Sequence, residues 1–154
     1  MSSARVFDVA IVGGGPAGLT ASMHLARFKR SVVVLDAGDP RAALIPMSRN
    51  CPGFPEGIGG KDLLRRLRHQ ASTYDAEIVH AVVETINVRH GVFALSTAPG
   101  TVEALFVILA TGIVDKVPAI VGLREGKKIR RRGAGPEPDG SRFRTRGTGC
   151  GSYP

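Results

Sequence analysis

The sequence predicts an α/β domain built on a parallel sheet, and two observations support this prediction. Residues 7–12 (FDVAIV) form an apolar, β-rich run that ends at a glycine-rich turn, and a helical pattern begins at Pro16. Residues 31–35 (SVVVL) form a second apolar run without polar alternation, which is typical of a parallel strand buried on both faces. Strand, turn, helix and strand in this order make a βαβ unit.

Each element can be justified from its own residues. The first helix carries an apolar stripe that we expect to face the sheet, formed by Ala17, Ala21, Leu25 and Phe28. Residues 37–60 are rich in Pro and Gly and are expected to be irregular. A second helix is predicted over 61–74, with Leu63, Leu67 and Ala71 as its stripe and Leu64 widening it. Its arginines are expected in solvent, namely Arg65, Arg66 and Arg68.

The last predicted elements are three strands. Residues 78–88 and 92–97 are expected to pair through a turn at His90-Gly91 and to form a small antiparallel excursion. Residues 102–110 form the final strand, which leads into Ala110, Thr111 and Gly112.

Charge divides the chain at residue 123. The 154 residues carry a formal net charge of +8. Residues 1–123 hold 12 Lys+Arg and 10 Asp+Glu, a net charge of +2, whereas 124–154 hold 9 and 3, a net charge of +6. The second segment is rich in Gly, Arg and Pro and poor in apolar residues, so we expect it to be a disordered basic tail. A balanced main body does not indicate a nucleic-acid or membrane partner.

The glycine-rich turn has the spacing of a dinucleotide-binding fingerprint. We call residues 13–18 (GGGPAG) the glycine loop. Gly13 allows the tight turn, Gly15 allows the backbone to approach a pyrophosphate, and Gly18 allows the helix to pack on the strand. Asp36 ends the second strand, 18 residues after Gly18, where an acidic residue accepts hydrogen bonds from an adenosine ribose. Its charge would repel a 2′-phosphate, which disfavours NADP at this site.

The motif alone does not distinguish FAD from NAD, but a resemblance does. The segments DVAIVGGGPAGL, VVVLDAGDPR, SRNCPGFPEGIGGKDLLRRLRHQA and ILATG, in this order, resemble the flavin-binding N-terminal part of thioredoxin reductase-like NAD(P)/FAD-dependent oxidoreductases. The likeness covers residues 6–123. It implies that this part is one half of a split, Rossmann-like FAD-binding domain. In intact relatives, electrons would pass from NAD(P)H through FAD to a disulfide or another acceptor.

The resemblance also implies a set of cofactor contacts. Gly13, Gly14, Gly15, Pro16, Ala17 and Gly18 would hold the FAD pyrophosphate, and Asp36 would hold the adenosine ribose. Asn50 would lie on the flavin side, Val83 would meet the adenine through its backbone, and Ala110, Thr111 and Gly112 would pass close to the cofactor. Asn50 as a turn residue and Thr111 as a strand end remain alternatives. No residue is named as catalytic, and Cys51 is expected to be an incidental thiol because it lacks a partner cysteine.

The sequence departs from the family after residue 123. The 154 residues contain no second GxGxxG, no CxxC and no returning flavin-binding segment. We therefore expect an incomplete domain that is inactive by itself and retains flavin weakly; a stoichiometric flavin spectrum of the purified chain would contradict this. A frameshift after Leu123 would explain the tail, and translating the encoding DNA in its other two frames tests that hypothesis.

Two other functions remain open. The glycine loop and Asp36 fit an NAD-binding Rossmann module without flavin equally well, and comparing FAD with NAD binding separates the two. An RNA-binding role of the tail is disfavoured, because the tail has no repeat and few aromatics. Two distant cysteines indicate neither a disulfide scaffold nor a metal site, and a cytoplasmic protein is expected. Relatives suggest a homodimer.

Overall fold

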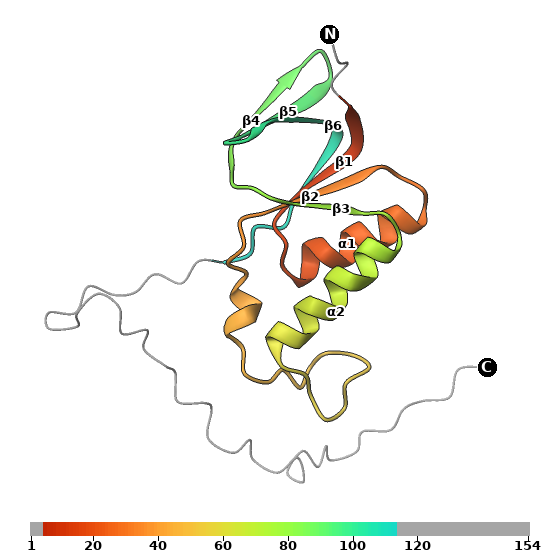
Figure 1. The fold of residues 1–154 in the computed structure, drawn as a ribbon, viewed down its shortest axis with the longest axis vertical. Coiled ribbons are helices and arrows are strands. Elements are labelled where there is room, and N and C mark those ends of the chain that lie inside the picture. Colours follow the sequence, from red (N-terminus) through yellow and green to blue (C-terminus); the bar gives the residue numbers. More distant parts are fainter. Residues whose placement is uncertain (1–4, 114–154) are drawn as a thin grey trace, which may run out of the picture. The chain divides into compact units, whose positions relative to one another are not determined.

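The computed structural model describes residues 5–113, which all belong to the first of two units of the chain, Met1–Asp115. The predicted tail, 124–154, lies outside the described residues, so its boundary stays a prediction. The elements in chain order are β1 (Val6–Val12), α1 (Pro16–Arg27), β2 (Val32–Asp36), the 3₁₀ helix η1 (Arg41–Leu44), α2 (Gly60–Thr73), β3 (Glu77–His80), β4 (Val83–Arg89), β5 (Val92–Thr97) and β6 (Gly100–Leu109) (Figure 1).

The predicted α/β fold is confirmed. The described strands form one six-stranded sheet in the order β3-β2-β1-β6-β5-β4. Strand β1 pairs in parallel with β2 and with β6, and β2 pairs in parallel with β3. Every residue of β2 is buried, as expected for a parallel strand covered on both faces. The hairpin strands β4 and β5 add the antiparallel part, because β5 pairs with both β4 and β6.

Strand β6 joins the parallel and the antiparallel parts of the sheet. Its residues Glu103 and Ala104 pair with β1 on one side and with β5 on the other. Leu95 of β5 is fully buried in one cluster with Ala10 and Val33 of the parallel strands. The opposite-facing residues of β1 and β2, which include Ile11, pack with α1 instead. The antiparallel part and the helices therefore cover opposite faces of the parallel strands (Figure 1).

Helix α1 packs against the rest of the domain with part of the predicted stripe and with residues outside it. Its buried residues are Gly18, Leu19, Ser22, Met23 and Ala26. Ala21 and Leu25 of the predicted stripe are partly buried and pack against the sheet residues of β1 and β2, as predicted. Ala17 is exposed in the first turn, and Phe28 is 78% exposed just after the helix, so the prediction was wrong for these two residues.

The predicted single strand over 78–88 is in fact two strands. Strand β3 extends the parallel edge of the sheet, and the Ala81 amide still donates to the Asp36 carbonyl at 3.0 Å. Val82 then turns into solvent, and β4 begins the hairpin at the other edge. Both segments are rich in residues that favour β-strands, so residue preferences alone do not show where one strand ends and the next begins. The predicted turn at His90-Gly91 is confirmed, with positive φ at both residues.

Within residues 5–113, no helix has the length and apolar character needed to cross a lipid bilayer.

Candidate functional site

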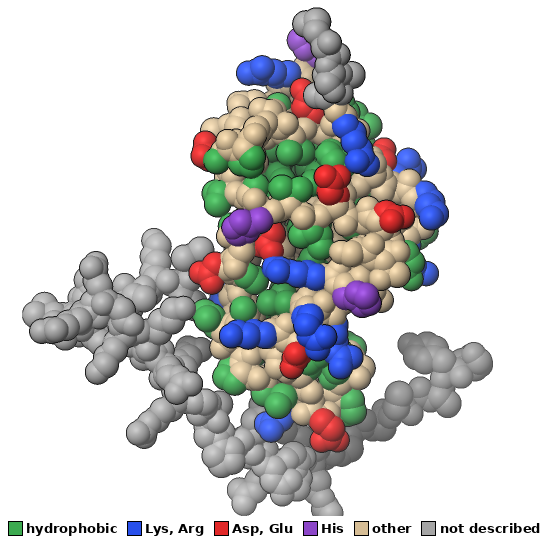
Figure 2. Space-filling view, in the orientation of Figure 1, with side chains coloured by type: hydrophobic (Ala, Val, Ile, Leu, Met, Phe, Trp, Pro, Cys, Tyr) green, Lys and Arg blue, Asp and Glu red, His purple; other side chains and the backbone are tan. Residues whose placement is uncertain are grey.

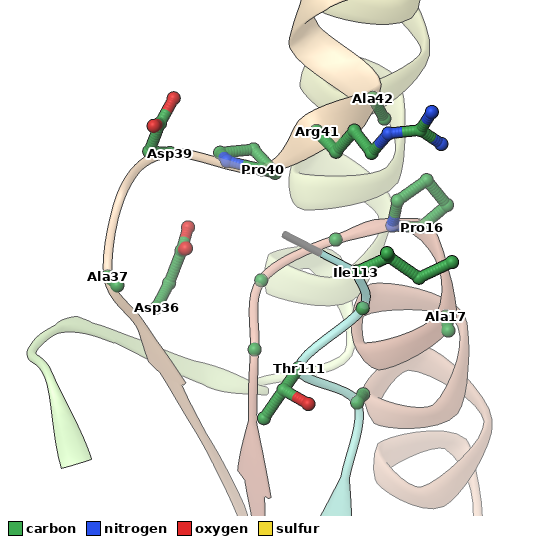
Figure 3. Close-up of a pocket in the computed structure, with 15 residues that line it drawn as sticks. Pro16, Ala17, Asp36, Ala37, Asp39, Pro40, Arg41, Ala42, Thr111 and Ile113 are labelled. Atoms are coloured by element: carbon green, nitrogen blue, oxygen red, sulfur yellow. The ribbon is translucent and has the colours of Figure 1, made fainter. Parts of the chain in front are cut away.

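A pocket of about 270 Å³ opens where β1, β2 and β6 end (Figure 3). These strands are parallel, so their carboxyl ends meet at one edge of the sheet, where ligands bind in open α/β folds. Three segments line the pocket: Gly13, Gly14, Gly15, Pro16 and Ala17 after β1; Asp36, Ala37, Asp39, Pro40, Arg41 and Ala42 after β2; and Ala110, Thr111, Gly112 and Ile113 after β6.

The glycines of the loop are packed closely, with one exception. A Cβ atom on Gly13 would lie 2.3 Å from the Ala110 carbonyl oxygen, and one on Gly14 would lie 2.2 Å from the Asp36 carboxyl carbon. A Cβ atom on Gly18 would lie 2.0 Å from the Gly13 carbonyl oxygen. By contrast, a Cβ atom on Gly15 would meet nothing within 4 Å. The open side of Gly15 is therefore available to a ligand.

The start of α1 supplies an electrostatic reason for an anion at this place. Gly15 is the N-cap residue, so no side chain caps the helix, and Pro16 occupies the first turn. The first residues of α1 line the pocket, and the backbone N–H groups at a helix N-terminus carry a partial positive charge. No acidic residue lies in the first turn of α1 to neutralise that charge. A pyrophosphate fits this environment.

Asp36 is held firmly at one end of the pocket. The residue is only 6% exposed. Its Oδ1 accepts a hydrogen bond from the Gly38 amide at 2.9 Å, and its Oδ2 is ion-paired with the Arg68 guanidinium of α2. A carboxylate has four acceptor positions, so both oxygens can still accept hydroxyl hydrogen bonds. This is the chemistry that a ribose with two hydroxyls requires.

Three of the predicted cofactor residues do not line this pocket. Gly18 lies beneath the loop, in contact with Gly13 and Ile11. Asn50 is exposed and accepts a hydrogen bond from the Ser48 hydroxyl at 2.8 Å. Val83 is half-buried at the start of β4 and packs on the core cluster. The contacts of Asn50 and Val83 with a cofactor stay predictions.

Two arginines near the pocket were missed by sequence reasoning. Arg41 lies in η1, and in Figure 3 its side chain extends toward Pro16 at the start of α1. Arg68 was expected in solvent, but it is half-buried and contacts Asp36, so that expectation was wrong. Its spacing held a signal: Arg68 lies four residues after Leu64 and three before Ala71, both of which are buried.

Cys51 is a free, half-buried thiol. Within the described part, no group of His, Cys, Asp or Glu side chains is arranged to hold a metal ion.

The parallel strands, the glycine loop and the buried acid at the end of β2 define the protein class as the Rossmann-like dinucleotide-binding proteins. A family model gives the particular assignment, because residues 7–134 match the pyridine nucleotide-disulphide oxidoreductases. The chain belongs to this family. The match extends beyond residue 123, where the sequence resemblance was expected to end.

Thioredoxin reductases are similar to this chain in both sequence and structure. The enzyme of Treponema pallidum is 36% identical over 121 residues, 77% of this chain and 39% of its own length. The NADPH-dependent thioredoxin reductase 3 of Arabidopsis thaliana is 37% identical over 111 residues, 68% of this chain and 21% of its own length. The crystal structure of the T. acidophilum thioredoxin reductase superposes with a TM-score of 0.71 at 35% identity, covering 77% of this chain and 39% of that one. The predicted thioredoxin reductase-like family is thereby confirmed, and the chain spans well under half of each of these relatives.

Proposed function

We propose that this chain binds the adenosine diphosphate half of FAD, as the flavin-binding part of an NAD(P)H-dependent oxidoreductase. The observation that carries the proposal is the open side of Gly15, which faces the same pocket as the buried carboxylate of Asp36. The first provides room for a pyrophosphate and the second provides acceptors for a ribose. Thioredoxin reductases as relatives favour FAD over NAD.

Each of the three segments that line the pocket has a part in this proposal. The glycine loop and the start of α1 hold the pyrophosphate, and Arg41 adds the positive side-chain charge that two phosphates require. Asp36 binds the ribose hydroxyls. Ala110, Thr111 and Gly112 are small and allow the cofactor to approach the end of β6. When bound, the flavin would supply the chemistry of accepting a hydride and passing on electrons.

The remaining parts of the proposal concern the whole oxidoreductase. It would take electrons from NAD(P)H and deliver them to a disulfide or another acceptor, act in the cytoplasm, and form a homodimer. These statements rest on the similarity to thioredoxin reductases, and the chain alone is not expected to catalyse the reaction.

Calorimetric titration of the 154-residue chain with ADP, FAD and NAD tests the proposal. We expect ADP and FAD to bind with similar affinity and NAD to bind more weakly. Asp36→Asn should weaken ADP binding by about tenfold, because one carboxylate oxygen becomes an NH2 group that cannot accept a hydroxyl hydrogen bond, and the negative charge is lost. Binding of NAD in preference to FAD would favour the alternative of an NAD-binding module. Absence of binding by all three ligands would refute both functions for this chain.

A further inference from the structure

We propose that Arg68 is a positioning residue for Asp36, which gives helix α2 control over how tightly the adenosine ribose is bound. The inference rests on the proposed function, because it takes Asp36 to be the ribose-binding residue. Arg68 is not among the residues that line the pocket, so it would act through Asp36 and not by contact with the ligand.

The ion pair joins two elements that are distant in the chain. Asp36 is the last residue of β2, and Arg68 lies in the third turn of α2. The Asp36 side chain is 8% exposed and the Arg68 side chain 42%, so the carboxylate is the desolvated partner. Removing a carboxylate from water costs free energy, and an ion pair with hydrogen bonds offsets part of that cost. Arg68 provides the positive charge of this pair from the side of the protein.

The contacts of Asp36 also fix the orientation of its carboxyl group. One oxygen is held by the Gly38 amide and the other by Arg68, and the Gly14 backbone lies against the carboxyl group. With both oxygens held, the acceptor positions left over have fixed directions. Preorganised acceptors bind a diol more tightly than acceptors that must first be ordered. Removing Arg68 frees one oxygen and leaves only the Gly38 contact.

A purely stabilising role explains this arrangement less well. An ion pair with one buried and one half-exposed partner contributes little net stability, because the loss of hydration offsets much of the attraction. Within residues 5–113, the Arg68 Nε is moreover buried without a hydrogen-bond partner, which adds a further penalty. A costly pair placed beside a ligand pocket is better explained by what it does for the ligand.

The same helix supplies a matched control. Figure 2 shows Lys and Arg side chains gathered over the surface around α2. Arg65 also pairs with a carboxylate, that of Asp62 at 3.3 Å, but both side chains are exposed, at 72% and 65%. Arg65→Gln thus removes the same charge from the same helix without touching the pocket.

The test compares ADP with 2′,3′-dideoxy-ADP, which lacks the ribose hydroxyls. We expect the wild-type chain to bind ADP more tightly by about tenfold or more. In Arg68→Gln this preference should fall to about twofold, with little change for 2′,3′-dideoxy-ADP. Arg65→Gln should keep the full preference, and Arg68→Lys, which restores the charge without the planar fork, should give an intermediate one.

Two results would overturn the inference: an unchanged preference in Arg68→Gln, or an equal loss of affinity for both nucleotides, which indicates a structural role. If Arg68→Gln does not fold, Arg68→Lys decides by the same comparison. A second measurement is independent of the ligand, namely hydrogen exchange of the Gly38 amide by NMR. Exchange should be faster in Arg68→Gln than in Arg65→Gln; equal rates contradict positioning. Failure of the wild type to bind ADP refutes the proposed function and with it the control of ribose binding; Gly38 exchange then shows only whether Arg68 positions Asp36.

Discussion

The backbone of Gly18 lies directly against the carbonyl group of Gly13, with 2.0 Å between the place of a Gly18 Cβ atom and the Gly13 oxygen. This contact sets how closely α1 approaches the turn that follows β1. This contact also constrains the conformation of Gly14 and Gly15, since these residues lie between Gly13 and Gly18 in the chain. The loop therefore contains glycines that the packing of the fold requires, and one glycine, Gly15, whose open side the fold does not use.

Gly18→Ala should destabilise the fold. The added methyl group has no space, and the atom that it meets belongs to the backbone and cannot rotate away. Overpacking of this kind costs about 1–3 kcal/mol, which exceeds the gain of about 1 kcal/mol from a better helix former. Urea unfolding followed by circular dichroism measures the change. A midpoint equal to that of the wild type would show that α1 can shift without cost.

Gly15→Ala should leave the stability of the fold unchanged and weaken the binding of ADP. The new methyl group meets no protein atom, and the backbone of Gly15, with φ −77° and ψ −179°, suits alanine. The free energy of unfolding should stay within about 0.5 kcal/mol of the wild type. Affinity for ADP should fall by more than about tenfold, because the methyl group would occupy the place that we propose for the pyrophosphate. Adenosine, which has no phosphate, is the control ligand and should lose much less.

Arg41→Gln should weaken the binding of phosphates specifically. Arg41 is the cationic side chain among the residues that line the pocket, so its removal reduces the attraction for ADP and its dependence on salt. We expect an affinity loss of about threefold to tenfold at low salt. The exposed Arg49 lies outside the pocket, and Arg49→Gln should bind ADP like the wild type. Equal losses in both variants would mean that only the net charge matters.

Asp8→Asn should change how stability depends on pH. The Asp8 carboxylate accepts hydrogen bonds from the Ser31 amide at 2.7 Å and the Ser31 hydroxyl at 2.9 Å. These hydrogen bonds hold the pKa of Asp8 below its ordinary value of 3.8, although burial opposes them. The ionised group thus stabilises the fold above that ordinary value, and this contribution is lost as the pH falls through the lowered pKa of the folded state.

The measurement is the difference in unfolding free energy between wild type and Asp8→Asn from about pH 6 to about pH 2. The difference should be largest near pH 6 and shrink as the pH falls. Ser31→Ala removes the two side-chain hydrogen bonds of the hydroxyl and should reduce the same pH dependence. A difference that is constant across the range would show that the charge of Asp8 is not involved.

The sequence predicted those parts of the site that depend on local order. The spacing of Gly13, Gly15 and Gly18 placed the loop between a strand and a helix, and Asp36 marked the end of the next strand. Both features arise within one βαβ unit, so neighbouring residues contain the information. Thr111 was placed near the cofactor only by the family resemblance, and the parallel pairing of β6 with β1 explains why it lies beside the loop.

The features that the sequence did not predict depend on contacts between distant elements. The position of Arg68 follows from how α2 is rotated against α1 and β2, and a pattern of three leucines does not determine that angle. The break between β3 and β4 likewise depends on where Ala81 finds a hydrogen-bond partner, on β2. Arg41 reaches the pocket only because η1 folds back after β2. In each case a tertiary contact determines the position of the residue, and the residue preferences of the segment itself do not indicate that contact.

The attachment of the loop to β6 has a consequence for the order of folding. The Ala110 amide donates to the Val12 carbonyl at 2.9 Å, and the Ala110 carbonyl oxygen lies where a Gly13 side chain would be. Strand β1 leaves the ribosome first, but the turn that follows it makes its contacts with Ala110 only after β6 has been synthesised. We expect a nascent chain to acquire ADP affinity only after residue 110 has emerged. Nucleotide binding would then report that folding is complete, and it could not act as a template for the early steps.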